Sequence, residues 1–139
     1  MVEAKAFLSR IRLYDTHINN KLEELQRIRN LATKITTTLK SDVVSTSGNI
    51  DKIGDAVAKI VDLEAEINQA IDEYVDLKRE VSAVINQITD PNLLGVLQKR
   101  YLLYEPWEQI ACEMGYTYRN ICYLHGEALQ AVSDLLAGK

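Results

Sequence analysis

The fold is decided by residues 51–89, which read DKIGDAVAKIVDLEAEINQAIDEYVDLKREVSAVINQIT. Two columns of apolar side chains run through this stretch, each repeating every seven residues. They are Ile53, Ile60, Ile67, Tyr74, Val81 and Ile88 in one column, and Ala56, Leu63, Ala70, Leu77 and Val84 in the other. A strict heptad repeat of this length predicts a helix that supercoils around a partner.

The partner is expected upstream in residues 3–40, which contain no Pro or Gly. Their heptad columns are Ile11, Ile18, Leu25, Ala32 and Leu39, and, three residues further on, Tyr14, Ile28 and Ile35. Lys21 interrupts the second column, and we expect its ammonium group to extend past the seam. Residues 3–40 carry eight Lys or Arg against four Asp or Glu, whereas residues 51–89 carry four against nine. These opposite charges favour an antiparallel coiled-coil hairpin of the two helices.

A domain boundary is expected near Thr89, between a hairpin of residues 1–89 and a domain of residues 90–139. Asp90 followed by Pro91 is typical of a helix start, because aspartate caps a helix and proline fits its first position. Three helices are predicted beyond this point, over residues 92–104, 107–115 and about 118–136. The predicted class is therefore all-α.

The last two predicted helices have the residue spacing of a helix-turn-helix. Ala111 is a small residue, Gly115 follows it four positions on, and the aliphatic Ile121 and Leu124 come six and nine positions after the glycine. Two short helices that cross at about 90–120° need this order of small residue, turn glycine and branched apolar residues. Thr117 stands where it can cap the second helix. A plain three-helix bundle without a role on DNA is the alternative interpretation.

In a helix-turn-helix, the first turns of the second helix enter the major groove of DNA. The residues expected to face base edges and phosphates are Thr117, Tyr118, Arg119, Asn120, Cys122, Tyr123 and His125. Arg119 can bind guanine bidentately and Asn120 can bind adenine in the same way. Residues 90–139 carry four Lys or Arg against six Asp or Glu, so nonspecific affinity should be weak. DNA recognition is therefore expected in an oligomer or in a larger DNA-bound complex.

The remaining polar and aromatic residues of the C-terminal domain are interpreted as structural. Tyr101, Tyr104 and Trp107 are expected to pack in the core and at the hinge rather than to stack on bases.

His125 follows Cys122 by three positions, but the chain offers few further ligands for a metal, which needs three or four. No Gly-rich phosphate loop, His-Glu-x-x-His or Gly-x-Ser-x-Gly motif occurs. We predict a protein that is not an enzyme and uses no metal or cofactor.

Charge and cysteine usage indicate the compartment. The net charge of −4 is too mild for a protein that coats nucleic acid nonspecifically. The chain has two cysteines and no disulfide framework around them, its first residues are rich in charge, and no apolar run is long enough to span a bilayer. The expectation is a cytoplasmic protein without a membrane segment.

Four groups of C-terminal residues also carry a resemblance to a known family. They are Arg100-Tyr101, Trp107-Glu-x-Ile-Ala, Gly115-Tyr-Thr-Tyr-Arg119 and Leu124-His125-Gly-x-Ala-Leu129. They resemble a domain of small phage and mobile-element proteins, and this domain is similar to region 4 of bacterial sigma factors. Those proteins are similar in outline to phage transcription activators of the ArpU and RinA type. The preceding segment of that family is similar to Ser47-Gly-Asn, Asp55-Ala-Val, Lys59-Ile-Val-Asp-Leu-Glu and Val75-Asp-Leu-Lys. Two residues depart from the pattern: Pro106 stands where a Thr or Ser usually caps the helix, and Glu127 where a basic residue is common.

The resemblance implies a phage- or prophage-type transcriptional regulator in the cytoplasm of a bacterial host. It would bind double-stranded DNA as a homo-oligomer, with a dimer favoured, or together with RNA polymerase. Two alternatives stay open, namely a DNA-packaging protein like a terminase small subunit, and a helical protein-interaction module without DNA binding. A dimer in solution would suit the regulator, and a ring of about eight or more subunits would suit packaging.

Overall fold

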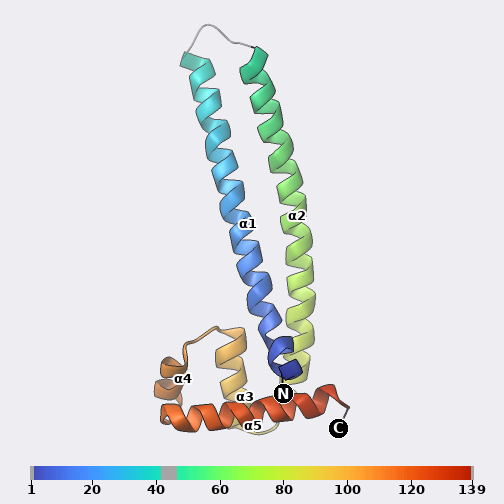
Figure 1. Cartoon of the computed structure of the whole chain (residues 1–139), viewed down its shortest axis with the longest axis vertical. Helices are drawn as coiled ribbons and strands as arrows, with labels where there is room; N and C mark the ends of the chain where they lie inside the picture. The colour runs from blue at the N-terminus through green and yellow to red at the C-terminus, as the bar shows by residue number, and fades with distance from the viewer. Residues whose placement is uncertain (1, 42–46, 139) are drawn as a thin grey trace. The chain divides into compact units, whose positions relative to one another are not determined.

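The computed structural model describes the backbone of residues 2–41 and 47–138 and the side chains of residues 2–37 and 51–138. The elements are α1 (Val2–Ser41), α2 (Ser47–Ile85), α3 (Pro91–Leu97), a π-helical turn η1 (Gln98–Leu102), α4 (Trp107–Met114) and α5 (Tyr118–Leu136) (Figure 1). No strand occurs in the described ranges, which confirms the all-α prediction. None of the helices described there is long and apolar enough to cross a membrane.

The two long N-terminal helices agree with the prediction to within a few residues. The first was expected over residues 3–40 and the second over 51–89, whereas α2 both begins and ends four residues earlier than expected. The chain leaves α2 early because Gln87 and Ile88 donate backbone hydrogen bonds only three residues back, which tightens the last turn. Ile88 is nevertheless buried, so the apolar repeat continues beyond the helix. The turn between the two helices was expected over residues 41–49. Of these, residues 42–46 lie outside the described ranges, and residues 47–49 already belong to α2.

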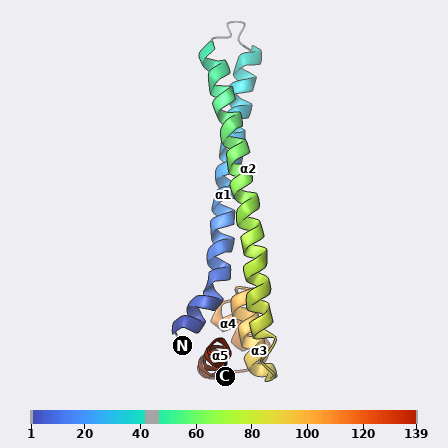
Figure 2. The ribbon, with the colours of Figure 1, turned by 90° about the vertical axis from the view of Figure 1, so that its right-hand side faces the viewer.

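The chain divides into two compact units, Met1–Tyr14 with Tyr74–Lys139 as the first and Asp15–Glu73 as the second. In the second unit α1 and α2 run side by side (Figures 1 and 2) around buried Leu25, Leu63 and Ile67. Lys21 Nζ lies 2.8 Å from Glu66 Oε2, and Arg29 pairs with Glu64. Arg29 follows Lys21 along α1, whereas its partner Glu64 precedes Glu66 along α2. The two helices are therefore antiparallel. The Lys21 contact confirms that its ammonium group passes the seam.

The core of the first unit joins the first turns of α1 and the last turns of α2 to the C-terminal helices. Its buried residues are Ala4, Leu8, Ile11, Leu77, Val81, Ile85, Ile88, Leu97, Tyr101, Ala128, Leu129 and Val132. Each fully buried aliphatic side chain contributes about 1.5–3 kcal/mol to stability. The boundary predicted near Thr89 falls inside this unit. In Figure 1 α5 runs across the end of α3, and the turned view of Figure 2 looks almost along the α5 axis beside α3.

The helix predicted over residues 92–104 ends two residues early and in an irregular way. Asp90 accepts from the amides of Asn92 and Leu93 with Pro91 in the first turn, as predicted. The helix then widens into η1, where Leu103 N donates to Gln98 O at 3.1 Å. Tyr104 adopts a φ of 59°, which is rare for a residue with a side chain. Pro106 disfavours the α conformation at the preceding residue, Glu105, so the helix cannot continue into α4.

Candidate nucleic-acid interface

The connection between α4 and α5 is a tight turn built from one glycine and one threonine. Gly115 ends α4 with a φ of 72°, a left-handed conformation that favours glycine. Tyr116 N then donates to Ala111 O at 3.0 Å, which satisfies a carbonyl at the end of α4. Thr117 Oγ1 accepts from Asn120 N at 3.1 Å and caps α5, as predicted. The start of α5 is therefore fixed relative to the end of α4.

A small apolar cluster holds the two helices together. Its buried residues are Val96, Ile110, Ala111 and Ile121, and Trp107, Met114, Tyr116 and Leu124 pack around them. The residues that the spacing singled out for packing, Ala111, Ile121 and Leu124, thus meet in one cluster. Pro106 precedes α4 in an extended conformation and supplies no side-chain cap, as expected for a residue without a hydroxyl.

Six of the seven predicted DNA-facing residues lie on the outside of the first turns of α5. Thr117, Tyr118, Arg119, Cys122 and Tyr123 are exposed and Asn120 is half-buried. We call these six residues the outer face. Tyr118 and Tyr123 keep 53% and 65% of their surface exposed, respectively, which leaves both rings open to a partner.

The outer face is only weakly cationic. A hydrogen bond to Glu127, followed by the charge of that carboxylate, raises the pKa of Tyr123. A hydrogen bond to Cys122 has the largest effect in raising the pKa of Tyr118. Both phenols therefore stay protonated as hydrogen-bond donors at neutral pH. Glu127 places a negative charge beside this face, where a phosphate would be repelled.

His125 lies apart from the outer face. Its Nε2 is 2.6 Å from the hydroxyl of Tyr101, and its ring packs edge-on against Trp107 with centroids 4.6 Å apart. Burial, and then the charges of Lys5 and Arg100, lower the pKa of His125 to about 4. The imidazole is therefore neutral at neutral pH and offers no positive charge to a phosphate. Tyr101, Tyr104 and Trp107 are buried or half-buried, in keeping with their interpretation as packing residues.

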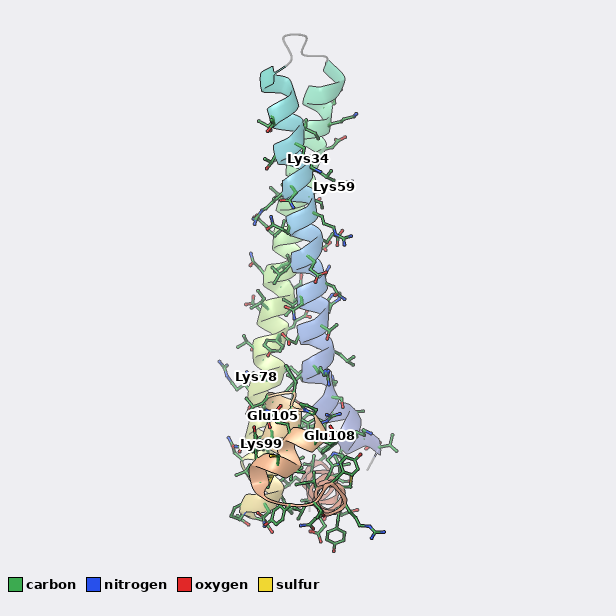
Figure 3. All side chains as sticks on the ribbon, turned by 90° about the vertical axis from the view of Figure 1, so that its left-hand side faces the viewer. Lys34, Lys59, Lys78, Lys99, Glu105 and Glu108 are labelled. Carbon is green, nitrogen blue, oxygen red and sulfur yellow. The ribbon has the colours of Figure 1, made fainter. Side chains whose placement is uncertain are left out.

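An ionic cluster ties η1 to α4, and two of its members, Lys99 and Glu105, are labelled in Figure 3. Lys99 Nζ lies 2.6 Å from Glu113 Oε2 and 4.0 Å from Glu105 Oε2. The hydrogen bond from Lys99 is the largest cause that lowers the pKa of Glu113, to about 2, whereas burial raises the pKa of Glu105. Because these groups neutralise one another, Lys99 adds little positive charge near α5.

Sequence reasoning missed the cations that do gather near α4 and α5. Arg100 lies with its guanidinium 4.3 Å from the ring centroid of Trp107, and Arg12 lies 6.0 Å from that of Tyr104. Lys5 comes close enough to influence His125. Lys5 and Arg12 belong to the first turns of α1, seven residues apart and therefore on one helix face. The spacing of Lys5 and Arg12 is visible in the sequence, but the surface of η1 and α4 that they face is not.

Neither cysteine is part of a metal-binding group. Cys112 and Cys122 are free and exposed. Over the described residues, no three His, Cys, Asp or Glu side chains come together as metal ligands would.

No protein-family model, curated protein or solved structure matches this chain.

Proposed function

We propose that this chain is a phage- or prophage-type DNA-binding transcriptional regulator whose α4 and α5 form a helix-turn-helix. The observation that carries the proposal is the turn at residues 115–117, where a left-handed glycine ends α4 and a threonine cap starts α5. Burial of Ile110, Ala111 and Ile121 on the facing sides leaves the outer face of α5 directed to solvent. This is the arrangement by which such motifs present a helix to the major groove.

The outer face contains side chains that can contact DNA. Arg119 can grip guanine O6 and N7 or a phosphate, and Asn120 can pair with adenine. The Thr117 oxygen accepts from the Asn120 amide, so its own hydrogen can still be donated to a phosphate. Tyr118 can donate in the same way. His125 is left out of this set, because its imidazole is engaged with Tyr101 and Trp107.

The charge of this region favours action in an assembly. Arg119 is the sole Lys or Arg between Trp107 and Gly138. One copy would therefore release few counterions from DNA and bind weakly alone. The regulator would act in the cytoplasm of its bacterial host as an oligomer on double-stranded DNA, or beside RNA polymerase in the manner of sigma region 4.

Exposed apolar residues on α2 support association with a second copy of the chain. Val57, Val61 and Ile71 remain 50%, 58% and 39% exposed, and their spacing puts them on one stripe of the helix. The basic α1 and acidic α2 make a second copy the matching partner, because α1 of one copy can lie against α2 of the other. Val61→Glu should shift the mass in sedimentation equilibrium toward the monomer, whereas Ala58→Glu, an exposed neighbour off the stripe, should not.

Selection of bound fragments from a random DNA library, at stated salt, tests the proposal. The expected result is an enriched sequence with two half-sites, which the Arg119→Ala, Asn120→Ala double variant binds at least about tenfold more weakly. Gln130→Ala changes an exposed residue further along α5 and should keep full affinity.

Three results would contradict the proposal. Unchanged binding by the double variant would remove the outer face from the interface. No DNA binding at any salt would favour the protein-interaction module, and a ring of about eight or more subunits in solution would favour the packaging class.

A further inference from the structure

A cavity of about 230 Å³ lies among the first turns of α1, η1 and the start of α4. Its lining residues are Lys5, Ser9, Arg12, Leu13, Arg100, Tyr101, Tyr104 and Trp107. All of them belong to the first compact unit. Three of the eight are cations and three are aromatic, a composition that differs from that of a hydrophobic crevice. Neither the packing of the core nor the outer face makes use of this combination.

Within the ranges that the structure describes, Lys5, Arg12 and Arg100 form no ion pair with a carboxylate. The guanidinium of Arg100 is held in place by its stacking on Trp107 and by donation from Nη1 to Glu105 O at 3.0 Å. That hydrogen bond uses one of its five N–H donors. The side chain is thus oriented in advance and still has donors for a ligand.

The wall of the cavity is stiffened from behind. Tyr101 is buried and hydrogen-bonded to His125, and the His125 ring also supports Trp107. The charges of Lys5 and Arg100 contribute to the low pKa of His125, which indicates a positive potential in this part of the unit. A rigid aromatic wall in a positive potential selects an anion that also carries a flat ring.

We propose that this cavity binds a free nucleoside monophosphate, with its phosphate on Lys5 and Arg12 and its base on the guanidinium plane of Arg100, which itself stacks on Trp107. A phosphate offers the doubly charged, multi-oxygen acceptor that guanidinium groups bind bidentately. Bases stack on aromatic rings and on guanidinium planes. At about 230 Å³ the cavity is smaller than the roughly 300–1,000 Å³ usual for ligand pockets, so it suits at most one nucleotide, part of which would stay outside it. The proposal does not depend on DNA binding by the outer face.

The same chemistry could come from a nucleic-acid strand instead of a free nucleotide. A nucleotide of a duplex would have to leave its base stack to enter the cavity, which costs a few kcal/mol. A free nucleotide enters without that cost, and we therefore assign the cavity to it.

Fluorescence offers a direct test, because Trp107 is the only tryptophan of the chain. The full chain is titrated with the four nucleoside monophosphates, with the nucleosides alone and with inorganic phosphate. The expected result is a saturable change in Trp107 emission for at least one monophosphate. Its nucleoside and inorganic phosphate should bind at least about tenfold more weakly, because each lacks one half of the contacts.

Matched substitutions on α1 locate the site. Arg12→Gln and Lys5→Gln should each weaken binding about tenfold, as loss of a charged hydrogen bond does. Arg10→Gln changes an exposed cation of the same helix that does not line the cavity and should leave the affinity unchanged. Arg12→Lys keeps the charge and should recover part of the affinity. Far-ultraviolet circular dichroism of each variant shows whether the helices are retained.

Several outcomes would overturn the assignment. They are the absence of a saturable change up to about 10 mM nucleotide, an equal loss in Arg10→Gln, and a response to single-stranded or duplex oligonucleotides with none to monophosphates. The Arg119→Ala, Asn120→Ala variant separates the two proposals, because it should lose DNA affinity and keep nucleotide affinity.

Discussion

At the scale of the residue, Gly115 is a position where the backbone conformation favours glycine. Its φ of 72° disfavours any side chain, although a Cβ added there would meet nothing within 4 Å. Gly115→Ala should therefore lower the free energy of unfolding by about 1–2 kcal/mol, through backbone conformation alone. Gly126→Ala is the matched control, since Gly126 lies inside α5 with equally open space. It should raise stability by about 0.5–1 kcal/mol in the same urea titration.

His125 makes stability depend on pH. Its pKa is about 4 in the folded chain, below the ordinary value of 6.5, because burial disfavours the charged ring. The unfolded chain therefore binds more protons between these two values, and stability should fall as pH drops from 6.5 toward 4. Above pH 6.5 the residue should contribute no pH dependence. Urea midpoints measured across this range should show the decline.

Substitution of each histidine identifies the group responsible. His125→Gln should remove much of the decline, while His17→Gln, at an exposed position, should retain it. An unchanged profile in His125→Gln would mean that carboxylates such as Glu113 dominate the acid behaviour.

At the scale of the element, the cap of α5 links stability to the proposed DNA contacts. Thr117 is the acceptor for the Asn120 amide, and Asn120 is itself a proposed base contact. Thr117→Ala should cost about 1 kcal/mol and let the first turn of α5 fray, so DNA affinity should fall as well. Thr117→Ser keeps the oxygen and should restore both quantities. A loss of stability without loss of DNA affinity would contradict the placement of this turn in the groove.

The helices were predictable because each has a local signal. The bounds of α5 coincide with the predicted range, and both predicted caps, Asp90 and Thr117, are in place. The π-helical turn was not predictable, because no repeat of apolar side chains indicates that a helical turn contains one extra residue. The conformation of Tyr104 follows from that turn and from the proline beyond it, and propensity alone favours a helix at this position.

At the scale of the whole molecule, the predictability of a surface depends on how many elements build it. The outer face of α5 comes from a single helix, so its exposed residues could be listed from periodicity. The cavity requires α1 from one end of the sequence and η1 from the other. Lys5, Arg12 and Arg100 come together only after the tertiary core forms. A pattern within one helix cannot predict which distant residue will complete the cavity. The contact of His125 with Tyr101 could not be predicted from periodicity for the same reason, because Tyr101 lies in another element.

The salt dependence of DNA binding distinguishes the surfaces that contact phosphate. The logarithm of the association constant falls with that of the salt concentration by about 0.9 for each phosphate neutralised. If the outer face alone contacts DNA, Arg119 supplies one cation per copy, so a dimer should give a slope of about −2. Arg119→Ala should flatten this dependence, whereas Arg12→Gln should leave it unchanged. A slope steeper than about −5 that becomes shallower in Arg12→Gln would place the cavity cations on DNA phosphates. The cavity would then be part of the nucleic-acid interface and not a site for a free nucleotide.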